Sequence, residues 1–236
     1  MYKRQGYLDL AAYGEKYKDS ANVGMWDIVD SLQWIQDNIE NFGGDPDNVT
    51  IFGQSGGGCK VLNMFATSEA EGLFDQAVVQ SGGEGHIDQD IAKKVTAKTL
   101  EILGISDNEV EQLKEVPYDT LDAAATEAQK QVGEELGTSV GWSPVLDEDY
   151  LHTDFLDWTN DVPVMVGSVF GEFNCWTALD PNEPNKNSWT EEEVDEKLTE
   201  KYSDKAEAVK EAFLEAYPEK SACDAYYLSL IHISEP

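Results

Sequence analysis

The chain has 236 residues and is 41% hydrophobic, which suits one sizeable folded core and excludes a disordered chain. Its formal net charge of −31, from 47 acidic and 16 basic residues, would repel a phosphate backbone and argues against nucleic-acid binding. The sequence lacks the run of about 18 apolar residues that a membrane-spanning helix needs.

The predicted elements begin with a helix over 26–42, whose apolar residues recur at steps of three and four. The segment GGDPDN at 43–48 ends that helix, and the β-branched run at 49–52 predicts a short buried strand. A second helix is expected from Gly57 onward, followed by a buried strand within 74–82. This alternation predicts an open, mostly parallel sheet with helices on both faces.

The second half of the chain is richer in helix. Residues 89–136 are acidic with helical apolar spacing and are expected to form a helical, cap-like insertion. The segment 162–173 returns to strand composition and ends in a loop. Two charged helices are predicted over 190–217, where Thr190 and Glu193 have the spacing of a capping box.

These elements predict one partial domain over residues 6–228 that is incomplete at both ends. The end segments 1–5 and 229–236 fit no element around them, so we expect them not to be native to the fold.

The cysteines point to no metal and to no disulfide framework, because Cys59, Cys175 and Cys223 form neither a C-x-x-C pair nor a His–Cys cluster. We therefore expect no cofactor. The sequence leaves the compartment open between the bacterial cytoplasm and secretion, and it leaves the oligomeric state unknown.

The most informative motif joins the strand at 49–52 to the helix after it. Gly53-Gln54-Ser55-Gly56-Gly57 is a G-x-S-x-G sequence, and its place between a strand and a helix is that of a nucleophile elbow. Glycines relieve the crowding of such a sharp turn, because they carry no Cβ atom. The alternative is a glycine-rich turn with a serine that takes no part in chemistry.

An elbow serine suits acyl transfer from an ester or amide. The turn would expose the Ser55 hydroxyl and aim the N–H of Gly56 at the oxyanion that develops on the attacked carbonyl. The start of the following helix would add partial positive charge. The hydroxyl still needs a base to remove its proton during attack.

Four segments resemble, in order, blocks of the type-B carboxylesterase family, which includes bacterial esterases and cholinesterases. They are NVGMWDIVDSLQWIQDNIENFGGDPDNVTIFGQSGGG, GLFDQAVVQSGG, WSPVLDEDYL and VPVMVGSVFGEF, and the resemblance extends over nearly all of residues 6–228. It implies an α/β-hydrolase fold and a serine esterase that acts on small-molecule carboxylic esters through an acyl-enzyme.

The resemblance also implies roles for particular residues. Ser55 matches the nucleophile, Glu172 the acid that orients the imidazole, Gly56 an oxyanion donor, and Ser81 a supporting serine near the triad. The chain departs from the family pattern at Gln54, where glutamate is usual. It also has Gly56 where alanine is usual, and Phe173 where a glycine usually follows the acid.

Neither the histidine nor the glycine-rich oxyanion loop of the family has a match. His86 and His152 precede Glu172, which is the wrong chain order, and His232 lies in the end segment that we exclude. We therefore expect the 236 residues alone to be inactive. The alternatives are a catalytically inactive binding or adhesion protein of the same fold, and a lipase, which the acidic segment 89–136 disfavours.

Overall fold

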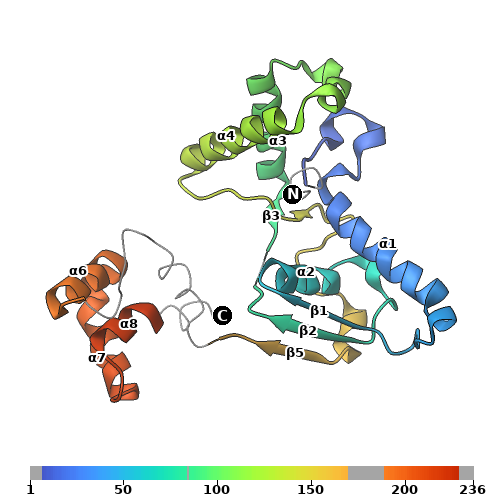
Figure 1. Ribbon diagram of the computed structural model, residues 1–236. Helices are drawn as coiled ribbons and strands as arrows, with labels where there is room; N and C mark the ends of the chain where they lie inside the picture. The colour runs from blue at the N-terminus through green and yellow to red at the C-terminus, as the bar shows by residue number, and fades with distance from the viewer. Residues whose placement is uncertain (1–6, 84, 170–188, 229–236) are drawn as a thin grey trace. The chain divides into compact units, whose positions relative to one another are not determined.

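The computed structural model describes residues 7–83, 85–169 and 189–228. The chain divides into two compact units, residues 1–166 and 167–236. The helices of the first unit are α1 (Val23–Asn38), α2 (Gly56–Phe65), α3 (Gln89–Leu103) and α4 (Tyr118–Leu136). The strands are β1 (Thr50–Gln54), β2 (Gln76–Gln80), β3 (Ile87–Asp88), β4 (Val145–Leu146) and β5 (Val164–Gly167), which reaches the unit boundary (Figure 1).

The main sheet has three strands in the order β1–β2–β5, and β1 and β2 run parallel. Their register pairs Thr50 with Gln76 and Gln54 with Gln80. The first strand is therefore longer than the expected 49–52, because Gly53 and Gln54 continue the ladder up to the elbow. Strands β3 and β4 form a second, parallel pair.

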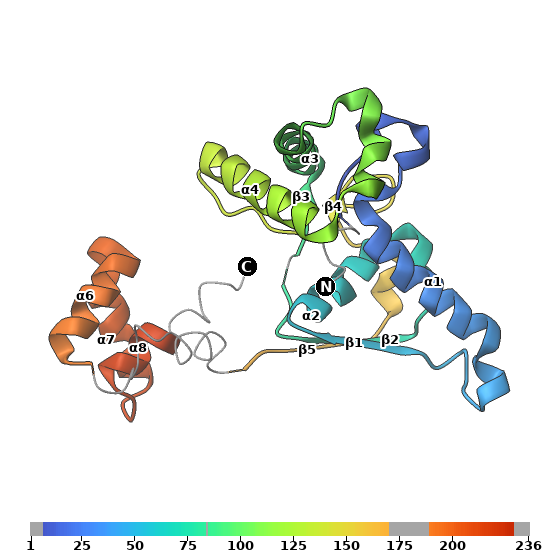
Figure 2. The same ribbon diagram turned by 45° about the horizontal axis from the view of Figure 1, so that its top comes forward.

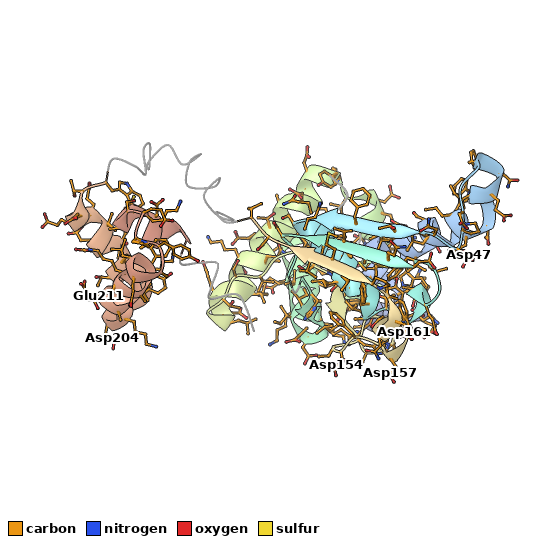
Figure 3. All side chains as sticks on the ribbon, turned by 90° about the horizontal axis from the view of Figure 1, so that it is seen from below. Asp47, Asp154, Asp157, Asp161, Asp204 and Glu211 are labelled. Atoms are coloured by element: carbon orange, nitrogen blue, oxygen red, sulfur yellow. The ribbon has the colours of Figure 1, made fainter. Side chains whose placement is uncertain are left out.

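Helices α1 and α2 lie on the same face of the three-stranded sheet (Figure 2). In the described residues of the first unit, no helix covers the opposite face, which Figure 3 shows from below. On β1, Phe52 is 74% exposed, and on β5, Met165 is 68% exposed. An apolar strand surface is thus left open to solvent.

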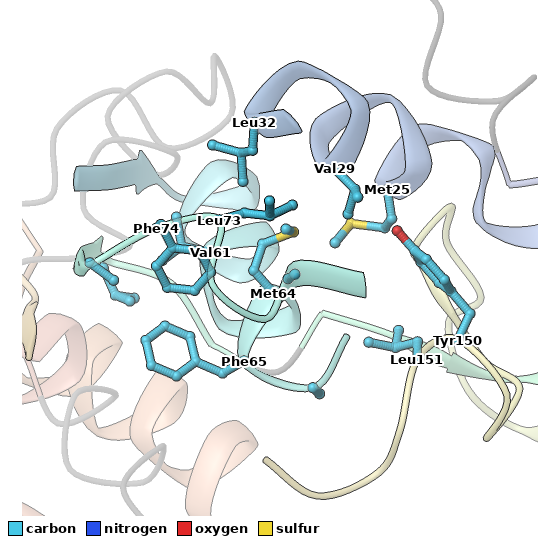
Figure 4. Packing of buried hydrophobic residues seen from close by; sticks show 14 of the residues in the cluster. Met25, Val29, Leu32, Val61, Met64, Phe65, Leu73, Phe74, Tyr150 and Leu151 are labelled. Carbon is cyan, nitrogen blue, oxygen red and sulfur yellow. The ribbon is translucent and has the colours of Figure 1, made fainter. Parts of the chain in front are cut away.

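The core lies between the sheet and α1, with α2 at its centre. Figure 4 shows Met25 and Leu32 of α1 on the side that faces Val61 and Met64 of α2. Met25 is fully buried and Leu151 closes the cluster from a loop far along the chain. Burying such side chains contributes about 1.5–3 kcal/mol each, so this contact fixes α2 and the elbow at its start.

The first helix differs from its prediction at both ends. It begins at Val23, and from Ile39 to Phe42 the chain tightens into a 3₁₀ turn that ends at the left-handed Gly43. The expected apolar face is only partly correct, because Phe42 is exposed and packs on Trp34 (ring centroids 5.8 Å apart). Met25 contributes to the buried face instead.

The helices expected within 89–136 are present as α3 and α4, joined by a 3₁₀ segment at Asp107–Glu115. They pack on each other through Val95, Ala128 and Val132, all buried. Among the described residues, none of the helices has both the length and the apolar character needed to cross a bilayer.

The second unit contains α6 (Glu191–Tyr202), α7 (Ala206–Ala216) and α8 (Ala222–Leu228). The predicted capping box is confirmed: the Glu193 N–H donates to Thr190 Oγ1 (3.3 Å), and the Thr190 N–H donates to Glu193 Oε2 (2.7 Å). Val194 and Leu198 form the buried face of α6. The sequence did not single out α8.

Candidate functional site

Ser55 occupies the turn between β1 and α2. Its backbone has φ 54° and ψ −123°, a conformation that non-glycine residues rarely adopt. The turn is held to the sheet because the Ser55 N–H donates to the carbonyl oxygen of Gln80 on β2 (2.9 Å). Ser55 itself is exposed, so the strained turn presents its hydroxyl to solvent.

Two glycine contacts make this turn possible. A Cβ atom on Gly53 would lie 2.3 Å from the backbone carbon and oxygen of Gly57, which is far closer than atoms can approach. A Cβ atom on Gly58 would lie 2.9 Å from the Cα atom of Gly82, just beyond β2. The start of α2 therefore rests directly on the ends of both strands, and only glycine fits at these positions.

The first turn of α2 offers unpaired backbone donors beside Ser55. The first bond of the turn runs from the Cys59 N–H to the Ser55 carbonyl oxygen (2.9 Å), so the N–H groups of Gly56, Gly57 and Gly58 precede it. In the part of the chain that the structure describes, no side chain caps this end of the helix. The donors and the helix dipole together suit a negatively charged oxygen.

Ser81 lies beside Ser55 at the carboxyl edge of the sheet. The β1–β2 register ends with Gln54 opposite Gln80, so the next residues along the two strands are the two serines. Ser81 is half-buried and also has a positive φ, of 49°. Gln54 is exposed at the end of β1.

Among the described residues, no side chain makes a hydrogen bond to Ser55 Oγ. Two histidines are described, and His152 bonds elsewhere: its Nε2 lies 2.8 Å from the hydroxyl oxygen of Ser68. Glu172 and His232 lie outside the described residues, and so does Phe173. The pairing of Ser68 with His152 was not foreseen, and no motif connects residues 84 positions apart.

Tyr7 is a titratable side chain close to α2. The ammonium of Lys60 lies 5.7 Å from the centroid of the Tyr7 ring. Burial, helped by the charge of Asp27, raises the pKa of Tyr7 to about 12. The raised pKa keeps the phenol protonated over a wider pH range than that of an exposed tyrosine.

The described residues contain no group of three His, Cys, Asp or Glu side chains placed to hold a metal ion. Cys59, on α2, is a free thiol.

Comparison with known proteins places this geometry among esterases. The profile of the carboxylesterase family matches residues 5–229. The para-nitrobenzyl esterase of Bacillus subtilis is 38% identical over 120 residues, which are 51% of this chain and 24% of that protein.

Solved structures agree with the sequence match. An esterase from Clostridium hathewayi, described as hydrolysing aliphatic aromatic polyesters, aligns with a TM-score of 0.72 and 42% identity over 94% of this chain and 45% of that one. The carboxylesterase of Geobacillus stearothermophilus aligns with a TM-score of 0.69 and 28% identity over 97% of this chain and 47% of its own. The chain thus spans less than half the length of these relatives.

Proposed function

Because the chain belongs to the carboxylesterase family and carries a partial α/β-hydrolase fold, we propose that it is part of a serine hydrolase that cleaves carboxylic esters. The observation that carries this proposal is the elbow, where a strained and exposed Ser55 adjoins the free N–H groups of α2. Ser203 has nearly the same backbone conformation (φ 53°, ψ −124°) at the end of α6, so the argument depends on strain that coincides with the G-x-S-x-G spacing at the start of a helix.

The proposed reaction passes through an acyl-enzyme. The Ser55 hydroxyl oxygen attacks the ester carbonyl while a histidine takes its proton, and the Gly56 N–H donates to the resulting oxyanion. The alcohol then leaves with the proton from the histidine. Water then attacks the acyl-enzyme in the same way, which releases the acid and restores Ser55. Ser81 is proposed to support the turn beside the nucleophile.

The remaining triad members are proposed on the resemblance alone. Glu172 is the candidate for the acid that orients the imidazole. We propose that the histidine and the second oxyanion donor come from polypeptide outside these 236 residues, because the relatives are more than twice as long as the aligned region. On this proposal the 236-residue chain lacks turnover, whereas the complete hydrolase is active.

The proposed substrates are small-molecule esters. The aliphatic aromatic polyester named for the Clostridium hathewayi relative belongs in the first substrate panel, together with short-chain para-nitrophenyl esters and an emulsified triglyceride. Preference for the emulsion would favour a lipase over an esterase of soluble substrates.

The test is fluorophosphonate labelling of the complete hydrolase, with the adduct mapped by mass spectrometry. We expect an adduct on Ser55 that Ser55→Ala removes together with turnover, and a strongly reduced rate in Glu172→Gln. An exposed serine outside the site, Ser139, provides the control Ser139→Ala, which should keep full activity. A complete protein that leaves Ser55 unlabelled would instead be an inactive binding member of the fold.

A further inference from the structure

We propose that Ser68 and His152 form a second nucleophile–base pair, separate from Ser55, which takes an acyl or phosphonyl group from small uncharged activated esters. The pair lies wholly within the described first unit and needs no further polypeptide. The pair lies beyond the C-terminal end of α2, opposite to the end that carries Ser55, because Ser68 comes three residues after the last residue of that helix.

The proposal begins with three side chains in a row. His152 Nε2 lies 2.8 Å from Ser68 Oγ, and its Nδ1 lies 3.8 Å from Glu148 Oε2. General-base activation of a serine requires an imidazole nitrogen within hydrogen-bond distance of its hydroxyl, which Ser68 and His152 provide, and the Glu148 carboxylate lies near the other ring nitrogen at longer range. Ser68 is exposed, and the His152 side chain is 25% exposed, so a reagent has access to both.

The backbone fixes the spacing of the two residues. Thr67 and Leu151, the residues just before Ser68 and His152, form an antiparallel bridge, and both are fully buried. The His152 N–H also donates to the carbonyl oxygen of Ala66 (2.9 Å). These backbone contacts hold the Cα atoms of Ser68 and His152 in register, so that only the side-chain rotamers remain to be set.

The carboxylate is positioned by a tight turn. Glu148 has a φ of 59°, and its side chain accepts a hydrogen bond from the Thr153 hydroxyl. The preceding residue, Asp147, accepts the N–H groups of Tyr150 (2.8 Å) and Leu151 (3.0 Å) through Oδ1. The loop is thus built around two carboxylates, of which Glu148 faces the imidazole.

A pocket of about 220 Å³ adjoins the imidazole and has room for a short group beside it. His152 forms part of its wall, together with the apolar side chains of Leu62, Ala66 and Phe155. Asp154 also lines it and is among the surface acids labelled in Figure 3. The Asp154 carboxylate in the lining disfavours anions, so the pocket suits a short, uncharged acyl or alkyl group.

In the proposed step, Ser68 Oγ forms a bond to the carbonyl carbon or to phosphorus. Its proton passes to His152 Nε2. With an ester, the alcohol leaves and takes that proton; with a fluorophosphonate, fluoride leaves and the proton goes to solvent. The product is a Ser68 ester in either case, and no oxidant, reductant or metal is needed.

The test uses the 236-residue chain with Ser55→Ala, labelled by an uncharged alkyl fluorophosphonate and mapped by peptide mass spectrometry. Ser106 is the internal reference, because it is exposed and its hydroxyl contacts the Glu109 carboxylate without an imidazole. We expect Ser68 to react about 10²-fold faster than Ser106, the lower end of what a positioned general base contributes.

Two substitutions separate the proposed roles. His152→Gln should reduce labelling of Ser68 to the level of Ser106, whereas Glu148→Gln should reduce the rate less. His86→Gln is the matched control, because His86 lines the same pocket but makes no hydrogen bond to a serine in the described structure. Equal rates at Ser68 and Ser106, or an unchanged rate in His152→Gln, would overturn the proposal. Neither result depends on whether Ser55 is labelled in the complete hydrolase.

Discussion

Gly53→Ala probes the contact on which the elbow depends. The added Cβ atom would lie 2.3 Å from the carbonyl carbon of Gly57. Carbon atoms normally approach to about 3.5 Å, so the overlap is about 1.2 Å (3.5 − 2.3) and involves backbone on both sides. The overlap can be relieved only if α2 moves away from β1, and that movement disturbs the core around Met64. We expect a loss of at least about 3 kcal/mol in the free energy of unfolding, the upper part of the range for overpacked sites.

The matched control is Gly57→Ala, four residues away in the same motif. A Cβ atom there meets nothing within 4 Å, and the residue lies in α2. Alanine should therefore stabilise by about 0.5–1 kcal/mol through its lower backbone entropy. Urea unfolding, followed by far-UV circular dichroism and tryptophan fluorescence, measures both variants. If Gly53→Ala were as stable as Gly57→Ala, the close packing of α2 on β1 would be refuted.

Three further predictions follow from other parts of the chain. Ser55→Gly should be about 1 kcal/mol more stable than Ser55→Ala in urea unfolding, because glycine adopts the positive φ of this position without strain. Equal stabilities of the two variants would argue against backbone strain at the elbow. Burial raises the pKa of Asp9, and its Oδ2 atom has no hydrogen-bond partner in the described structure. The Asp9 carboxyl therefore binds its proton more tightly in the native state than in the unfolded state. Asp9→Asn should therefore be more stable than the wild type at neutral pH, and thermal melts should show this advantage shrinking as pH falls through the raised pKa. Thr190→Ala should lower the stability of the second unit by about 1 kcal/mol, because it removes the N-terminal cap of α6. Thermal melting measures this loss, and Thr199→Ala is the control, since Thr199 is an exposed threonine inside the same helix.

Local chemistry explains which parts of the fold were predictable from sequence. The elbow was predictable because glycine spacing, strand composition and helix start all lie within ten residues. The capping box at Thr190 and Glu193 was predictable for the same reason, since both partners lie in one helical turn. Strand and helix ends were less accurate, because they depend on partners elsewhere, such as Gln80 for the end of β1.

Contacts between distant residues were not predictable. Asn22 binds both backbone groups of Val145, donating to its carbonyl oxygen (2.8 Å) and accepting its N–H (2.9 Å), across 123 positions of sequence. Ser68 and His152 likewise meet only because Thr67 and Leu151 form their bridge. No periodicity or motif marks such pairs, since each depends on the path of the intervening chain.

The open face of the three-stranded sheet affects whether the 236-residue chain aggregates in solution. Phe52 and Met165 form an apolar surface on this face beside unprotected strands, and such surfaces favour self-association. A net charge of −31 opposes this through long-range repulsion between molecules. That repulsion is screened beyond about 10 Å at 0.1 M salt, whereas hydrophobic contact is not. Charge repulsion therefore keeps molecules of the isolated chain apart in dilute buffer. As ionic strength rises and screens this repulsion, we expect the chain to aggregate.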